Sequence, residues 1–254
     1  MPDPFTQIGG TTYHTYTLLL ALSIVVSAGA GVLRLRGRYP AGKVADAYLA
    51  ALLLGVAGAR AEHNLLHWDY FGENLGDITN LYTGGLNWHG AILGGLLGLY
   101  LVSRWRGLNF HQLCDSLVLA LPLIALGAWW GCGASHCAYG REVTTLADYP
   151  AWVAAESADV YGIVLPRYNT QVFGIILALA GLAFAGLLAW RDWMPSRRFW
   201  LVLALLAAGQ FIVGFFRDDP MYTIAGLRAD QWLDALVFVW AGIGALQAKV
   251  RRTG

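Results

Sequence analysis

The sequence predicts an all-α, polytopic membrane protein with about seven transmembrane helices. Hydrophobic residues make up 57% of its 254 residues and charged residues only 13%, and the mean hydropathy is +0.51. A soluble domain carries roughly 25% charged residues. Because an Asp, Lys or Arg at the centre of a spanning helix costs about 3 kcal/mol, this depletion of charge indicates that most of the chain lies in lipid.

Seven apolar stretches approach the roughly 20 residues that a helix needs to span the hydrocarbon core. Their expected bounds are Tyr13–Leu33, Ala45–Leu66, Trp88–Ser103, Leu113–Gly131, Gln171–Trp190, Trp200–Phe216 and Trp232–Gln247. The third is short, but Gly90, Gly94 and Gly98 repeat along it at a spacing that lets helix backbones approach closely in lipid. No basic residue precedes the first stretch, so we expect an uncleaved first helix and a single membrane domain over residues 1–254.

The basic residues are distributed unevenly between the two sides of this topology. With alternating crossings, twelve of the 17 lie in four connections on one side: Arg34, Arg36, Arg38 and Lys43; Arg104 and Arg106; Arg191, Arg197 and Arg198; and Lys249, Arg251 and Arg252. The other side holds five, namely Arg60, Arg141, Arg167, Arg217 and Arg228. Basic connections stay in the cytoplasm, which places the N-terminus outside and the C-terminus inside. The net charge of +1 and the lack of a basic stripe argue against nucleic-acid binding.

Two long polar segments, at about residues 67–87 and 132–170, fall on the outer side and are rich in Trp, Tyr, Asp, Asn and Gly. Loops of this length in a compact protein are usually functional. We therefore expect the working face to point outward.

His89 lies where the first of these segments turns into the third span, bracketed by glycines. Its imidazole can take a proton near neutral pH; the alternative is an interfacial histidine that only hydrogen-bonds a carbonyl. Arg60 lies near the outer end of the second span, where a guanidinium can bind a phosphate with two hydrogen bonds. The alternative for Arg60 is an internal pair with Glu62 or another acid.

The patterns that could bind a metal are incomplete. His63 and His67 share a helix face at i,i+4, but Asn64 follows the first histidine where a zincin has Glu. Cys132 and Cys137 can form a disulfide in an oxidising compartment or remain free thiols, and no second ligand pair of a zinc site is apparent. We expect neither a metal nor a cofactor, since phosphate-loop, nucleophile-elbow and paired dinucleotide-binding glycine motifs are absent from the sequence.

Two further polar groups flank the later spans. Gln171 opens the fifth span, and Arg217 closes the sixth beside Asp218 and Asp219. For Arg217 the alternative is a surface ion pair worth under ~1 kcal/mol.

Several blocks of sequence, taken together and in order, resemble the prolipoprotein diacylglyceryl transferase family. They are GARAEHNLLHWDYF followed by GENLGDI, then GGLNWHGAILGG, GCGASHCAYGRE and YNTQVFG, and finally FIVGFFRDDP followed by GLRADQW. The resemblance covers about residues 12–245, and the glycine–histidine block is its most specific part. Tyr16 also falls where the family has a tyrosine.

The resemblance implies an enzyme of the bacterial inner (plasma) membrane that moves a diacylglyceryl group from phosphatidylglycerol to the lipobox cysteine of a secreted preprotein. A thiol of pKa about 8.5 needs a base, and the resemblance gives this role, or that of proton relay, to His89. The leaving glycerol phosphate needs cationic stabilisation. The substrate-binding positions implied are Tyr16, Arg60, Asn87, Cys132, Tyr139, Arg141, Gln171 and Arg217. In the family fold we expect the His89 turn, Arg60, Arg217 and the loop that starts at Tyr139 to converge on one site.

The sequence departs from the family pattern at two arginine positions. Trp129 replaces one, and Gln210 replaces the other, four residues before Gly214 where the family has Glu. Neither Trp nor Gln can clamp a phosphate as a guanidinium does, and losing one such contact can cost about 10²-fold in rate. Two alternatives therefore stay open: a related membrane transferase with another lipid donor or acceptor, and a non-catalytic lipid- or lipoprotein-binding relative.

Overall fold

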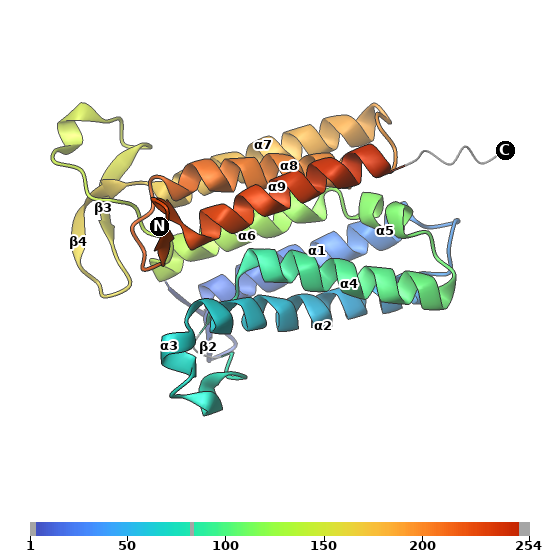
Figure 1. Ribbon diagram of the computed structural model, residues 1–254, viewed down its shortest axis with the longest axis horizontal. Coiled ribbons are helices and arrows are strands. Elements are labelled where there is room, and N and C mark those ends of the chain that lie inside the picture. Colours follow the sequence, from blue (N-terminus) through green and yellow to red (C-terminus); the bar gives the residue numbers. More distant parts are fainter. Residues whose placement is uncertain (1–3, 82–83, 249–254) are drawn as a thin grey trace. The chain divides into compact units, whose positions relative to one another are not determined.

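A computed structural model describes residues 4–81 and 84–248, and most of them are helical. The helices are α1 (Thr15–Arg34), α2 (Ala41–Leu66), α3 (Trp68–Phe71), α4 (Trp88–Arg106), α5 (Phe110–Ser116), α6 (Ala120–Ser135), α7 (Thr170–Trp190), α8 (Arg198–Gly214) and α9 (Ala229–Gln247). Short 3₁₀ turns occur at Leu75–Asp77 and Leu146–Asp148. Each of the seven predicted apolar stretches contains a helix (Figure 1). The basic residues Lys249, Arg251 and Arg252, which contribute to the predicted cytoplasmic C-terminus, lie outside the described residues.

Several predicted bounds differ from the observed helices by a few residues, as at the sixth predicted helix, which ends at Gly214 rather than Phe216. In two places the difference marks another kind of structure. The first helix begins at Thr15 rather than Tyr13, because Tyr13 belongs to a strand. The stretch Leu113–Gly131 is not one helix but α5 and α6 with a break between them. Pro122 explains the break, because a proline ring clashes with the carbonyl four residues earlier, that of Val118, in a continuous helix.

Three antiparallel hairpins were not predicted, one before α1 and two in connections between helices, so the fold is mostly rather than entirely helical. They are β1–β2 (Phe5–Ile8 and Thr11–His14), β3–β4 (Ala154–Ala158 and Val164–Tyr168) and β5–β6 (Thr223–Ile224 and Leu227–Arg228). The β3–β4 hairpin lies within the long segment 132–170, where Asp159 accepts hydrogen bonds from the backbone of Tyr161 and Ile163 at the turn.

Contacts divide the chain into two compact units, unit 1 (residues 1–29 and 118–254) and unit 2 (residues 30–117). In unit 1, α6, α7, α8 and α9 run alongside one another (Figure 1). Their core includes the buried residues Val118, Ala185, Leu188, Val202 and Leu206. The prediction of one domain over residues 1–254 stays a prediction.

Unit 2 is built on the close pairing of α2 with α4 (Figure 1). Glycines line the seam: a Cβ at Gly55 would lie 3.3 Å from the Ala91 carbonyl oxygen, and one at Gly98 would lie 2.5 Å from that of Ala50. Gly94 likewise faces the Leu54 carbonyl. The repeat of small residues in α4 thus allows the backbone contact that its spacing predicts.

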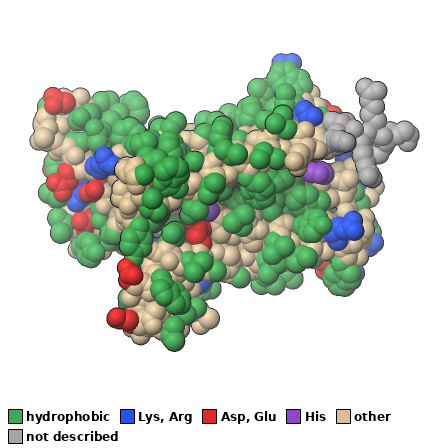
Figure 2. All heavy atoms as spheres, viewed as in Figure 1, with side chains coloured by type: hydrophobic (Ala, Val, Ile, Leu, Met, Phe, Trp, Pro, Cys, Tyr) green, Lys and Arg blue, Asp and Glu red, His purple; other side chains and the backbone are tan. Residues whose placement is uncertain are grey.

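Within the described residues, α1, α2 and α7 are each long and apolar enough to cross a membrane. The interrupted pair of α5 and α6 passes the same test as a fourth span, and α8 is apolar but has only 17 residues. Only a minor part of each of these helices is buried inside the protein. In an apolar 18-residue segment the buried share is 11% for α1, 33% for α2 and 28% for α7. Hydrophobic side chains accordingly cover much of the face drawn in Figure 2. Exposing so much apolar surface to water is unfavourable, whereas lipid accommodates it.

Candidate active site

His89 is buried in the first turn of α4, with 3% of its surface exposed. Its Nδ1 lies 2.8 Å from Oε1 of Glu62, which comes from the C-terminal part of α2. The second carboxylate oxygen of Glu62 accepts a hydrogen bond from the Gly90 backbone N–H. The imidazole therefore has a carboxylate partner that is itself fixed by the start of the helix.

Polar groups extend this pair along α2. The Asn87 side-chain amide faces Glu62 Oε1 at 3.5 Å, and its Oδ1 lies 3.3 Å from Nδ1 of His63. The His63 and His67 rings lie against each other at a tilt of 33°, with centroids 4.3 Å apart. His67 Nδ1 lies 3.0 Å from the His63 carbonyl oxygen, so the two histidines pack together along the helix.

Arg60 binds backbone carbonyls rather than a carboxylate. Its Nη2 donates to the Asp77 carbonyl at 2.6 Å, its Nε to that of Ile78 at 2.9 Å, and its Nη1 to that of Gly84 at 2.6 Å. Gly85 follows with a positive φ of 81° that favours glycine, and a Cβ there would lie 2.8 Å from Arg60 Nη1. Arg60 therefore ties the segment after α3 to α2.

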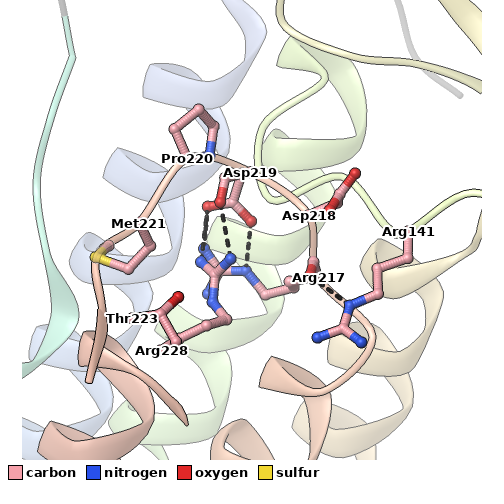
Figure 3. Close-up of a pocket in the computed structure, with 8 residues that line it drawn as sticks. All are labelled: Arg141, Arg217, Asp218, Asp219, Pro220, Met221, Thr223 and Arg228. Carbon is pink, nitrogen blue, oxygen red and sulfur yellow. Dashed lines mark hydrogen bonds and ion pairs between the residues drawn. The ribbon is translucent and has the colours of Figure 1, made fainter. Parts of the chain in front are cut away.

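Unit 1 contains a polar cavity of about 290 Å³ (Figure 3). It is lined by Arg141, Arg217, Asp218, Asp219, Pro220, Met221, Thr223 and Arg228. Asp219 accepts from Arg217 at 2.8 and 2.6 Å and from Arg228 Nη2 at 3.1 Å. Asp230 pairs with Arg217 at 3.1 Å and with Arg228 at 3.0 Å. Two arginines and two aspartates thus form a nearly neutral cluster.

The ionisation of Asp219 follows from this cluster. Burial by itself would raise the pKa of Asp219, but the charges and hydrogen bonds of Arg217 and Arg228 outweigh burial and hold the pKa below its usual value. The carboxylate therefore stays charged at neutral pH.

Arg141 approaches the same cavity from the loop after α6. Its backbone N–H donates to the Phe216 carbonyl at 2.8 Å, and the backbone of Gly140 pairs with that of Arg217. The Arg141 side chain is exposed and donates from Nε to the Arg217 carbonyl at 3.4 Å. Figure 3 shows its guanidinium turned away from Asp219. In residues 4–81 and 84–248 no carboxylate forms an ion pair with Arg141.

The end of α6 gathers the cysteines and Gln171. Cys132 and Cys137 form a disulfide, one of the two states that the sequence left open. Buried Gln171 donates from Nε2 to the Cys137 carbonyl at 3.0 Å, and Thr170 Oγ1 donates to the Ala138 carbonyl at 2.6 Å. The first residues of α7 thus hold the backbone that leads to Tyr139.

Two aromatic contacts join α6 to its neighbours, one made by Tyr16 of α1 and one by Trp129 of α6 itself. The Tyr16 side chain crosses Gly131, where a Cβ would come within 2.6 Å of its ring. Trp129 is 7% exposed, and its indole covers Gly174 of α7. The side chain that replaces a family arginine therefore fills an apolar contact between helices.

The structure brings the predicted site residues together in groups within each unit. Unit 2 holds Arg60, Asn87 and His89, while unit 1 holds the others: Tyr16, Cys132, Tyr139, Arg141, Gln171 and Arg217. Convergence of both groups on one site stays a prediction.

Sequence reasoning did not assign Glu62 to His89, nor Asp230 and Arg228 to the Arg217 cluster. An acid within an apolar span needs a partner, and this signal points to Glu62. Its partner could not be chosen without knowing how α2 packs on α4.

Comparisons with known proteins support the resemblance. A relative from Lysinibacillus sphaericus, named phosphatidylglycerol–prolipoprotein diacylglyceryl transferase, is 26% identical over 250 residues, which cover 94% of this chain and 89% of the relative. Relatives with the same name from Clostridium novyi and Streptococcus sanguinis are 25% and 27% identical and cover 93% and 97% of this chain; the matches cover 91% and 95% of those proteins. The profile of one family, described as prolipoprotein diacylglyceryl transferase, matches residues 4–247. This chain therefore belongs to the prolipoprotein diacylglyceryl transferase family.

Proposed function

We propose that this chain is a membrane transferase that moves a diacylglyceryl group from a phosphatidylglycerol-like phospholipid to the thiol of a lipobox cysteine in a secreted preprotein. The names of the relatives supply the donor and the acceptor. The observation that carries the proposal is the buried His89, paired at 2.8 Å with Glu62. A buried imidazole with a carboxylate partner is suited to proton transfer.

The reaction requires one proton transfer and one displacement. The thiol gives its proton to His89, and the sulfur forms a bond to the terminal glyceryl carbon of the lipid. The bond from that carbon to the phosphate oxygen breaks, and glycerol phosphate leaves with the electron pair. No metal or redox partner is needed for this balance.

The leaving phosphate needs a positive charge, and Arg141 is well suited to provide it. Arg217 and Arg228 are already paired with Asp219 and Asp230, whereas the exposed guanidinium of Arg141 has no such partner among the described residues. We assign the phosphate contact to Arg141, with Arg217 shaping the cavity behind it. We also retain Tyr16, Asn87, Cys132, Tyr139 and Gln171 as substrate-binding positions. Arg60 stays in this set as the residue that fixes the segment before Asn87.

We further propose seven spans in a bacterial inner (plasma) membrane, with the N-terminus outside and the C-terminus in the cytoplasm. The uneven distribution of basic residues supports this orientation. A reporter that works only in the cytoplasm should be active when it is fused after Gly254, and a reporter that works only in the periplasm should be inactive there. Activity that requires the periplasm would contradict the topology.

The transfer assay uses purified protein, labelled phosphatidylglycerol and a lipobox peptide. We expect transfer by the wild type and loss of at least about 10²-fold in His89→Ala. His111→Ala is the matched control because His111 lies on α5 outside the proposed site. Transfer from a different phospholipid only would identify a transferase with another donor. Absence of transfer from every phospholipid tested, with lipid binding retained, would identify a binding protein.

A further inference from the structure

The carboxylate of Glu62 uses its two oxygens on two different groups. Oε1 contacts His89 Nδ1 at 2.8 Å, and Oε2 accepts from the Gly90 N–H in the first turn of α4. The start of a helix carries a partial positive charge and unsatisfied N–H groups. The carboxylate is therefore held between the imidazole and the start of α4.

The helix seam explains how Glu62 reaches this position. Gly58 of α2 and Gly90 of α4 lie backbone to backbone, with no room for a Cβ on either. Glu62 lies one helical turn beyond Gly58, so it meets the first turn of α4 directly. Asn87, the residue before α4, makes no capping hydrogen bond with its own side chain within the described residues. Glu62 supplies that contact from the neighbouring helix.

Other charged and titratable groups lie near the pair. Arg60 is engaged by backbone carbonyls, and the Asp77 carboxylate accepts from the Tyr70 hydroxyl at 2.7 Å. His63, on the same end of α2, and His67, the residue after that helix, have their rings in contact with each other. In the first turn of α4, His89 is the titratable side chain.

We propose that Glu62 is the positioning residue for His89, holding the Nδ1–H tautomer so that the basic lone pair lies on Nε2. This inference rests on the proposed function and adds a residue to it. As the thiol proton moves to Nε2, the ring becomes an imidazolium, and the adjacent carboxylate stabilises that charge. Glu62 keeps its contact with Nδ1 throughout and touches neither the lipid nor the peptide.

The test compares Glu62→Gln with Glu62→Asp. The glutamine oxygen can still accept from Gly90, so the helix start keeps its cap and the melting temperature should change little. Its amide nitrogen can then only donate toward Nδ1, which favours the wrong tautomer. We expect kcat to fall about 10²-fold with KM unchanged. Glu62→Asp restores the charge and should recover part of kcat.

The pH profile separates positioning from a purely structural role. Activity of a general base rises with pH as the imidazole loses its proton. Removing the nearby negative charge makes the imidazolium less stable, so the rising limb of kcat in Glu62→Gln should move to lower pH. The inference would be overturned if Glu62→Gln kept the wild-type kcat and the wild-type pH profile. It would also be overturned if kcat fell only in proportion to a fall in melting temperature, because that loss would reflect destabilisation alone.

Nitrogen-15 NMR of labelled histidine separates this inference from the proposed function. The His89 signals, assigned by their loss in His89→Ala, should report a proton on Nδ1 in the wild type and on Nε2 in Glu62→Gln. That change without any lipid transfer would refute the function and keep the positioning role. Transfer that needs His89 but is unaffected by Glu62→Gln would refute the positioning role and keep the function.

Discussion

Arg217 and Asp219 are joined by two hydrogen bonds, from Nε to Oδ1 at 2.8 Å and from Nη2 to Oδ2 at 2.6 Å. Arg228 donates to the same Oδ2, so one carboxylate holds an arginine from each end of the loop between α8 and α9. Asp230 closes the cluster from the first turn of α9. The cluster fixes the end of one helix to the start of the next, and its positive charge is largely neutralised.

We expect Asp219→Asn to lower the free energy of unfolding by about 3 kcal/mol at neutral pH, because the buried Arg228 and the partly buried Arg217 lose a shared partner. The pKa of Asp219 is lowered in the folded protein. Its contribution is therefore complete above the unfolded pKa of about 3.9 and is lost as the pH falls through the folded value. Thermal unfolding in detergent, measured from neutral pH to about pH 3, should show this acid limb in the wild type and a flatter one in the variant.

Asp218→Asn is the control for that experiment, because the Asp218 side chain is 53% exposed and lies 3.8 Å from Arg167. It should change the melting temperature little. Equal losses of melting temperature in the two variants would contradict the role of Asp219 as the shared partner of Arg217 and Arg228.

Arg60→Lys tests whether Arg60 fixes a loop or binds a phosphate. A lysine has one nitrogen and cannot serve the Asp77, Ile78 and Gly84 carbonyls together, and a buried carbonyl left without a donor costs about 1–3 kcal/mol. Hydrogen exchange should therefore speed up across residues 75–81. Arg104→Lys, an exposed change on α4, is the matched control. Unchanged exchange with a raised KM for phospholipid would favour a direct contact with the headgroup.

Gly94 and Gly95 offer an internal comparison for the α2–α4 seam. A Cβ at Gly94 would collide with the Leu54 carbonyl, whereas one at Gly95 would lie at an ordinary 3.5 Å from that of Ala51. We expect Gly94→Ala to destabilise by about 2 kcal/mol. Gly95→Ala should be neutral or slightly stabilising, since Ala favours the helix. Denaturation of the two variants in the same detergent checks this, and equal effects would contradict the backbone contact.

The disulfide and Gln171 hold the same short backbone segment. Replacing both Cys132 and Cys137 by Ser should cost about 2 kcal/mol, as expected for a crosslink that closes so short a loop. Gln171→Ala removes the hydrogen bond to the Cys137 carbonyl. Because each restraint limits the damage from losing the other, the combined variant should lose more than the sum, by at least about 0.5 kcal/mol. Simple additivity would show that the two restraints act independently.

The helices were largely predictable because apolar length and charge depletion are local properties of the sequence. The prediction failed where local chemistry interrupts that pattern, at Pro122 and at the hairpin that includes Tyr13. His89 and Arg217 were identifiable as polar groups at helix ends. Their partners were not, because Glu62 lies 27 residues from His89 and meets it only through helix packing. The Arg60 expectation illustrates the same limit, since backbone carbonyls leave no signal in side-chain patterns.

The surroundings of Trp129 explain why restoring the family's arginine at this one position should not increase transfer activity. Its indole is 7% exposed and covers Gly174, a position without room for a Cβ. In Trp129→Arg the ring contact is lost, and a guanidinium enters an apolar gap between α6 and α7. Losing the ring alone costs about 3–5 kcal/mol, and an unpaired buried charge adds to that cost. We therefore expect a lower melting temperature and no gain in transfer, whereas Trp129→Phe should retain most of the stability. A stable Trp129→Arg protein with faster transfer from phosphatidylglycerol would show that the space beside Gly174 still accepts the family's arginine.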